Sequence, residues 1–173
     1  MRKNTQLGEP IEARALSERF KIVAVGGTFD EFHRGHRALL ETAFGVGKRV
    51  LIGLCTDDFV EKMGKPHEIA PFAVRLEELK GFLRKHGWLE RAEIVPLYNP
   101  YGPALTDKQI EAIVVSLETE PRAREINEKR EIANLRPLEV IVIDMVLAEN
   151  RDPISTTGIR RLEIDHEGRL LKR

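Results

Sequence analysis

The chain has 173 residues, of which 42% are hydrophobic, and this is enough material for a single buried core in one compact domain. Its 28 basic and 28 acidic side chains cancel, so the bulk charge favours neither a nucleic-acid partner nor an anionic membrane surface. No stretch approaches about eighteen uninterrupted apolar residues, and the charged N-terminus lacks the apolar core of a secretory signal. We therefore expect a cytoplasmic protein, a monomer or small homo-oligomer, whose anion sites are local.

Short β-branched apolar runs recur along the chain and are bounded by turn residues. They cover 22–25, 50–54, 94–95, 113–115 and 140–143, and helix-like segments between them cover 35–44, 72–86 and 122–134. Runs that are apolar throughout are typical of strands buried on both faces of a parallel sheet. The alternation predicts a single-domain α/β protein with a Rossmann-like open parallel sheet, helices on both faces and a ligand crevice beyond the carboxyl ends of the strands.

Two apolar features are expected to pack rather than to react. Cys55 is the single cysteine and lies in the run 50–55, which excludes an internal disulfide and predicts a buried, inert thiol. The residues Phe72, Leu76, Leu79 and Leu83 follow each other at spacings of 4, 3 and 4, which indicates one buried face of a helix. Residues 1–20 are interpreted as an extension, with a short helix over 11–19, before a domain over 21–173.

The first polar motif follows the first apolar run. It comprises Gly26-Gly27-Thr28-Phe29-Asp30 and then His33-Arg34-Gly35-His36 at the start of a helix. Glycines at the carboxyl end of a strand let backbone N–H groups approach a phosphate, and the helix start adds the positive end of a dipole. His33 and His36 are expected to share one face of the first turn, with room for a phosphate beside Gly35.

Two other interpretations of the histidine pair are open. The imidazoles are explained equally well as surface caps of the helix. A metal pair is disfavoured, because the remaining candidate ligands offer no second pair at metal spacing: Cys55, His67, His86 and His166.

The second polar motif, Asp152 to Arg160, follows the last apolar run. Ser155 has the chemistry of an N-cap, and the hydroxyls after it, with the free N–H groups of the first turn, can bind a triphosphate. Arg160 lies four residues after Thr156, so its guanidinium is expected to reach the same anion. Taken alone, this segment is better explained as a plain helix cap.

Together the two motifs resemble the nucleotidylyltransferase superfamily, in which an Ile-Ser-x-x-x-Ile-Arg type motif closes over the β- and γ-phosphates of ATP. Residues 154–160 match that motif. The resemblance implies an ATP site formed by Gly26, Gly27, Thr28, Phe29, Gly35, His36, Asn127, Ser155, Thr156, Thr157 and Arg160.

The middle of the chain, over 61–65, 71–83 with Arg75, and 114–119, most resembles the pantetheine-phosphate adenylyltransferase family, particularly its archaeal and eukaryotic branch. This resemblance implies transfer of the adenylyl group of ATP to 4'-phosphopantetheine. Nicotinamide mononucleotide, FMN and glycerol-3-phosphate-like acceptors remain alternatives within the superfamily, and a silent nucleotide sensor is the alternative outside enzymes.

The same resemblance implies roles for individual residues. The catalytic candidates are His33, His36, Lys62, Lys65 and Arg160, with no ranking between the two lysines, and the acceptor-binding candidates are Thr28, Lys62, Lys65, Asn99, Ser116, Glu118 and Thr119. Mg²⁺ is expected to accompany ATP without a protein cage, with Asp30 as the one candidate ligand.

One departure from the family pattern concerns the segment after the fourth strand. Bacterial enzymes carry an Arg-Gly-x-Arg segment there, whereas this chain has Ser116-Leu117-Glu118-Thr119-Glu120-Pro121. Arg122, Arg124 and Arg130 either supply the missing charge or lie on the exposed face of a charged helix.

Overall fold

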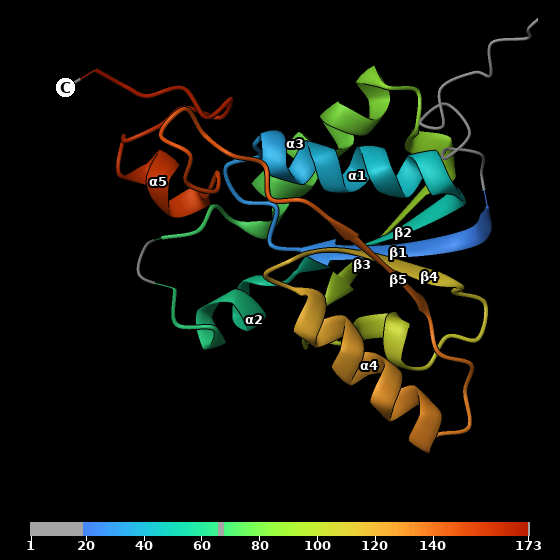
Figure 1. Cartoon of the computed structure of the whole chain (residues 1–173). Helices are drawn as coiled ribbons and strands as arrows, with labels where there is room; N and C mark the ends of the chain where they lie inside the picture. The colour runs from blue at the N-terminus through green and yellow to red at the C-terminus, as the bar shows by residue number, and fades with distance from the viewer. Residues whose placement is uncertain (1–18, 66–67, 173) are drawn as a thin grey trace, which may run out of the picture.

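The computed structural model describes residues 19–65 and 68–172, and its centre is one sheet of five parallel strands in the order β3-β2-β1-β4-β5 (Figure 1). The strands are β1 (Phe20–Gly27), β2 (Gly47–Cys55), β3 (Ala92–Leu97), β4 (Ala112–Ser116) and β5 (Glu139–Ile143). The chain moves outward from β1 to β3 and then returns to add β4 and β5 on the other side of β1. This reversal creates the switch point between β1 and β4 at which such sheets bind ligands. The predicted α/β class is confirmed.

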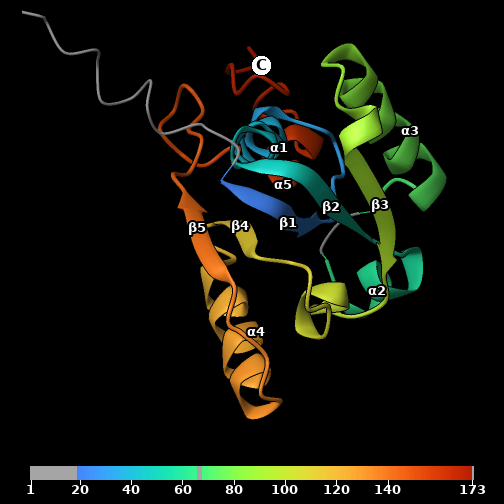
Figure 2. The ribbon, with the colours of Figure 1, turned by 90° about the vertical axis from the view of Figure 1, so that its right-hand side faces the viewer.

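Helices cover both faces of the sheet. The helix α1 (Arg34–Val46) and α3 (Phe72–Lys85) lie on one face, and α4 (Glu120–Ile132) lies on the other (Figures 1 and 2). The short helices α2 (Asp57–Lys62) and α5 (Thr156–Arg160) both lie where the strands end, at the left of Figure 1. The remaining helical turns are the 3-10 segments η2 (Leu89–Arg91) and η3 (Gly102–Leu105).

In the described chain, the connection between β3 and β4 is the one between successive strands that lacks an α-helix, and no helix-like segment was expected there. Between β3 and β4 the described chain contains the 3-10 segment η3 and no α-helix. Pro100, Gly102 and Pro103 explain this, because proline lacks a backbone N–H and Gly102 adopts a left-handed φ of 51°. An added Cβ at Gly102 would lie 2.3 Å from a methyl group of Leu97, so only glycine fits there.

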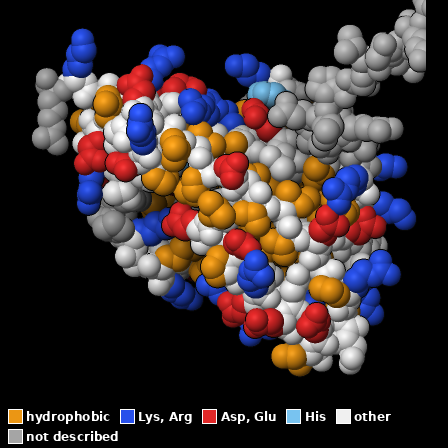
Figure 3. Space-filling model, viewed as in Figure 1, with side chains coloured by type: hydrophobic (Ala, Val, Ile, Leu, Met, Phe, Trp, Pro, Cys, Tyr) orange, Lys and Arg blue, Asp and Glu red, His pale blue; other side chains and the backbone are white. Residues whose placement is uncertain are grey.

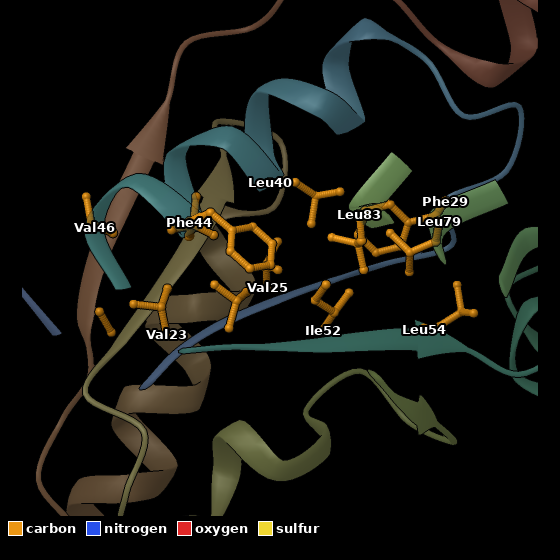
Figure 4. Close-up of a cluster of buried hydrophobic side chains, with 14 residues drawn as sticks. Val23, Val25, Phe29, Leu40, Phe44, Val46, Ile52, Leu54, Leu79 and Leu83 are labelled. Carbon is orange, nitrogen blue, oxygen red and sulfur yellow. The ribbon is translucent and has the colours of Figure 1, made fainter. Parts of the chain in front are cut away.

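Each central strand contributes to two cores, because alternate side chains point to opposite faces. Val23 and Val25 of β1 pack under α1 with Leu40 and Phe44 in the upper core (Figure 4). Ala24, between them, packs on the other face in a second core that includes residues of β4 and α4. The apolar runs that form the central strands β1, β2 and β4 are therefore buried on both sides, whereas the edge strands β3 and β5 are partly exposed.

The two features expected to pack do so. Leu79 and Leu83 are fully buried and point into the upper core, and Phe72 and Leu76 pack at its edge (Figure 4). Cys55 is buried, and burial raises the pKa of its thiol, which keeps the group protonated and unreactive. The helix expected over 11–19 falls almost entirely outside the described residues.

Arg130 differs from both expectations for it, because its guanidinium is buried within the fold. Its Nε donates to the carbonyl of Arg136 at 2.8 Å, and its Nη1 donates to the carbonyls of Ala104 and Asp107 at 2.8 and 2.9 Å. It therefore joins α4 to the segment before β4. Arg124 is exposed and pairs with Glu120 one turn earlier in α4.

Charged side chains of both signs are interspersed over the surface, and hydrophobic ones gather around the edge strand β5, where Val142 is exposed (Figure 3). No helix in the described part of the chain is long and apolar enough to cross a membrane.

Candidate active site

A cavity of about 640 Å³ lies at the carboxyl ends of the strands, and its size suits a small-molecule substrate. Both polar motifs line it. The first contributes Gly26, Gly27, Thr28, Phe29, His33, Gly35 and His36, and the second contributes Ser155, Thr156 and Thr157. The fold therefore brings together two segments that are separated by most of the chain.

The two histidines cap α1 through one nitrogen each. Gly35 N donates to Nδ1 of His33 at 3.1 Å, and His33 N donates to Nδ1 of His36 at 3.3 Å, which completes a reciprocal cap. The capping interpretation is thus correct, although His33 is only 6% exposed and is not a surface residue. Because each Nδ1 accepts a hydrogen bond, the proton of each neutral ring is assigned to Nε2. Capping therefore turns both rings into Nε2–H donors.

Stacking fixes the two rings further. The centroids of His33 and His36 are 3.8 Å apart, and the buried ring of Phe29 lies 5.3 Å from that of His36. A Cβ at Gly35 would lie 3.0 Å from Cε1 and Nδ1 of His33, so this glycine makes room for the imidazole. Gly35 also lines the cavity, and its expected role beside a phosphate stays a prediction. Phe29 is fully buried in the hydrophobic core and packs against His36 from there.

The surroundings keep both imidazoles uncharged near neutral pH. Burial, followed by the charges of His166 and Arg37, lowers the pKa of His33 to about 4, and Asp30 opposes this shift. Removal from water, followed by His33 and Lys65, lowers the pKa of His36 well below its usual value. The pair therefore offers hydrogen-bond donors that do not accept protons at pH 7.

The second motif forms a capped helix start, as expected. Ser155 Oγ accepts from Gly158 N at 3.1 Å and caps α5. Thr156 Oγ1 donates to the carbonyl of Asp30 at 3.1 Å, a contact across 126 residues of sequence. This bond places the start of α5 directly beside the first motif.

Arg160 and Asp30 bind each other. Nε and Nη2 of Arg160 donate to the Asp30 carboxylate at 3.1 and 3.0 Å, and that carboxylate is only 1% exposed. Arg160 does not line the cavity, so its guanidinium is not placed as the direct phosphate ligand that the spacing predicted. Both carboxylate oxygens of Asp30 accept hydrogen bonds within the protein, and Asp30 does not line the cavity. Among the described residues, no three His, Cys, Asp or Glu side chains gather to hold a metal ion.

The structure separates the two lysine candidates. Lys65 lines the cavity, and its charge acts on His36, whereas Lys62 ends α2 outside the cavity. Ser116, Glu118 and Thr119 also line the cavity, with Ser116 Oγ 3.2 Å from Thr119 Oγ1.

Two asparagines expected near substrate bind backbone instead. Asn127 Nδ2 donates to the carbonyl of Leu138 at 2.9 Å, and its Oδ1 accepts from Leu138 N at 2.7 Å. Asn99 Oδ1 accepts from the N–H groups of Tyr101 and Gly102 at 3.0 and 2.9 Å. Neither lines the cavity, so both are corrected from ligand contacts to structural residues.

Several cavity residues had no signal of their own in the sequence. On the side of β2 and β3 these are Phe59, Met63, Leu97 and Tyr101. Arg122, at the start of α4, also lines the cavity, and of the three arginines considered for the missing charge it is the one that does so. The Arg122 guanidinium lies 5.5 Å from the centre of the Tyr101 ring, and both side chains hydrogen-bond Glu125. The contact between Tyr101 and α4 depends on the fold and has no signature in the sequence.

The parallel sheet, the glycine-lined switch point and the two phosphate-type segments define a nucleotide-binding α/β protein. Residues 24–162 match the model of the cytidylyltransferase-like family, and the chain belongs to that family. This confirms the resemblance carried by the two motifs.

Curated relatives and solved structures agree with this placement. A phosphopantetheine adenylyltransferase from Methanothermobacter thermautotrophicus is 48% identical over 158 residues, covering 91% of this chain and 94% of that protein. Another from Methanopyrus kandleri is 46% identical, covering 82% and 90%. A crystal structure of a protein of unknown function from Archaeoglobus fulgidus has a TM-score of 0.63 at 36% identity, covering 70% of this chain and 88% of that one.

The depressed pKa of His33 predicts a loss of stability in acid. In the unfolded chain this imidazole titrates near 6.5, and in the fold its pKa is about 4, so the unfolded state binds the proton more readily between these values. The free energy of unfolding should therefore fall as the pH drops from 6.5, by about 3 kcal/mol at pH 4 from this group. Denaturant unfolding of the wild type and of His33→Asn, which keeps an acceptor at the Nδ1 position, measures the effect.

The substituted protein should lose this part of the pH dependence. His86→Asn, at an exposed histidine outside the cavity, serves as the control and should titrate like the wild type. An identical fall in the wild type and His33→Asn would contradict the assignment.

Proposed function

We propose that this chain is an enzyme that transfers the adenylyl group of ATP to 4'-phosphopantetheine, giving dephospho-CoA and pyrophosphate. One observation carries the proposal. A cavity that holds two uncharged imidazole donors also holds the hydroxyls at the start of α5. Relatives that match nearly the whole chain bear the name phosphopantetheine adenylyltransferase.

The protonation state of the histidines fits this reaction. An oxygen of the acceptor phosphate attacks the α-phosphorus of ATP, and the bond from that phosphorus to the β-phosphate oxygen breaks as pyrophosphate leaves. The attacking oxygen is already an anion at neutral pH, so no general base is required. Catalysis then depends on alignment of two polyanions and on donors aimed at the charge that develops on the α-phosphoryl group. His33 and His36 take that role.

The topology suggests which half of the cavity takes each substrate. Ser155 to Thr157 follow β5, so we assign the triphosphate to the side of β4 and β5. Ser116 to Thr119 follow β4, whose end pairs with β5, and we assign them to ATP as well, a change from the acceptor role first expected.

The side of β2 and β3 then takes the acceptor. We assign Thr28 and Lys65, which line the cavity, to its phosphate, and Phe59, Met63 and Leu97 to its long flexible arm. Lys65 is therefore preferred over Lys62 as the residue that bridges the acceptor and the transferring phosphates.

Mg²⁺ suits this site through the substrate. Its usual ligands in nucleotide enzymes are phosphate oxygens, waters and one or two carboxylates. Glu118 and Asp144 are the acidic side chains that line the cavity in the described part of the chain, and they are the candidates to approach the ion. The metal supplies charge neutralisation on the triphosphate. Because ATP and phosphorylated acceptors are held inside the cell, we place the reaction in the cytoplasm.

A substrate panel tests the function. The purified protein is incubated with Mg²⁺ and ATP, with 4'-phosphopantetheine, nicotinamide mononucleotide, FMN or glycerol-3-phosphate as acceptor, and pyrophosphate release is measured. A parallel series replaces ATP with CTP. Release with ATP and 4'-phosphopantetheine alone is expected. Release with another pair reassigns the substrate, and ATP binding without any release identifies a nucleotide sensor instead.

His36→Asn should lower kcat at least about a hundredfold, equivalent to about 2.7 kcal/mol of transition-state stabilisation. The asparagine keeps an acceptor for His33 N but offers no donor at the Nε2 position, so the helix cap survives and the catalytic donor is lost. Steady-state kinetics and thermal unfolding are compared with those of His86→Asn. A kcat close to the wild-type value in a folded protein would remove His36 from the mechanism.

The two lysines give a direct comparison. Lys65→Ala should raise the acceptor KM about tenfold and lower kcat, because a cation that contacts the acceptor phosphate contributes in both the ground and transition states. Lys62→Ala should change either constant by less than about twofold, the usual small effect of an exposed side chain. The reverse ranking in kinetic assays would contradict the assignment made from the cavity.

A further inference from the structure

Asp30 is a buried carboxylate that lines no part of the cavity, yet it holds three segments around it. Oδ1 accepts from Ala70 N at 3.0 Å and from Arg160 Nη2 at 3.0 Å, and Oδ2 accepts from Arg160 Nε at 3.1 Å. Its backbone carbonyl accepts from Thr156 Oγ1 at 3.1 Å. Every polar oxygen of this residue therefore binds another segment of the chain.

The backbone around Asp30 is bent in an unusual way. Phe29 and Glu31, its two neighbours, have φ values of 50° and 47°, in the left-handed region that non-glycine residues rarely adopt. Such conformations persist where surrounding contacts determine them and are concentrated at functional sites. Here the bend lets Phe29 and Asp30 both be buried while Thr28 faces the cavity.

Two of these contacts join Asp30 to segments near the proposed ATP side and the proposed acceptor side of the cavity. Arg160 and Thr156 belong to α5, whose first residues line the proposed ATP side. Ala70 lies between Lys65, on the acceptor side, and α3. The buried Arg75 also binds Ala70. Its Nε donates to the carbonyl of Ala70 at 2.7 Å, and its Nη1 donates to the carbonyl of Thr28 at 2.8 Å.

We propose that Asp30 is a positioning residue that sets α5 and the lysine-bearing segment relative to the histidines, and so aligns ATP with the acceptor. The inference rests on the proposed function. One arm runs from the Asp30 carboxylate through Arg160 to the triphosphate side. The other runs from the Asp30 carboxylate to Ala70, which follows Lys65 by five residues in the sequence. Arg160 acts in this arm through its paired hydrogen bonds to the Asp30 carboxylate.

The KM values for ATP and for the acceptor, measured separately, distinguish a positioning role from a purely structural one. Arg160→Met cuts only the first arm and should raise the KM for ATP at least fivefold, with the acceptor KM within twofold of the wild type. Asp30→Ala cuts both arms and should raise both KM values at least fivefold. Arg160→Lys, which keeps the charge but not the paired geometry, should recover part of the loss in ATP KM.

The control is Glu31→Gln. Glu31 lies 3.3 Å from the same guanidinium of Arg160 but is partly exposed and does not line the cavity, and both constants should stay within twofold of the wild type. Should Asp30→Ala fail to fold, Ala70→Pro tests the second arm alone, because proline has no N–H to donate to Asp30. It should raise the acceptor KM and leave the KM for ATP unchanged.

The results separate this inference from the proposed function. Activity of the wild type establishes the reaction first, and the variants are then measured under the same conditions. Lower unfolding temperatures in Arg160→Met and Asp30→Ala with both KM values within twofold of the wild type would overturn the positioning role. An inactive wild type would refute the function, and calorimetric ATP binding by Arg160→Met and Glu31→Gln would still test the first arm.

Discussion

The site depends on the way that α1 begins. Two backbone N–H groups at its start are satisfied by imidazole Nδ1 atoms, and this one choice of partner settles several other properties. It fixes the tautomer, since a ring that accepts at Nδ1 carries its proton on Nε2. It brings the two rings into a stack, which requires glycine at position 35 because a Cβ there would meet His33. It also holds both rings away from bulk water, which is why their pKa values fall. A serine or aspartate cap would satisfy the same N–H groups and supply none of these properties.

Around the start of α1, the fold brings together groups that are far apart in the sequence. A reaction between two anions needs groups from both sides of the switch point to be held at fixed separations. The strands end together at one edge of the sheet, which places the β1–α1 loop, the segment after α2 and the helix α5 near each other. Backbone contacts alone leave such loops free to shift. Buried charged groups restrict them: Arg75 binds the carbonyls of Thr28, Cys55 and Ala70, and Asp30 binds α5. Both of these buried charges have a charged partner, Arg75 the carboxylate of Asp57 and Asp30 the guanidinium of Arg160.

The sequence predicted the features that depend on local pattern. Strands such as 22–25 and 50–54 were recognisable because a β-branched run buried on both faces has no polar position, and Ser155 was recognisable as a cap from its own chemistry. The sequence did not predict which groups hydrogen-bond each other across the fold. An asparagine or arginine has the same appearance whether it faces a nucleotide or a distant carbonyl, so Asn127 and Arg130 were placed wrongly or left undecided. Arg160 illustrates the limit best: its helical position relative to Thr156 was correct, but its partner lies 130 residues away.

The protonation state of the histidines also bears on a competing reaction, the hydrolysis of ATP by water. ATP in a cavity with water is exposed to hydrolysis, and a water molecule, unlike an acceptor phosphate, must lose a proton as it attacks. An imidazole with a pKa near 7 beside the α-phosphate would be well suited to remove that proton. Here the two imidazoles nearest the proposed reaction centre have depressed pKa values, and their Nδ1 atoms are already occupied by backbone N–H groups. In the proposed reaction they stabilise charge on the phosphoryl group without activating water. The same feature that makes them good donors thus selects for an acceptor that arrives as an anion, and a phosphorylated substrate meets that condition.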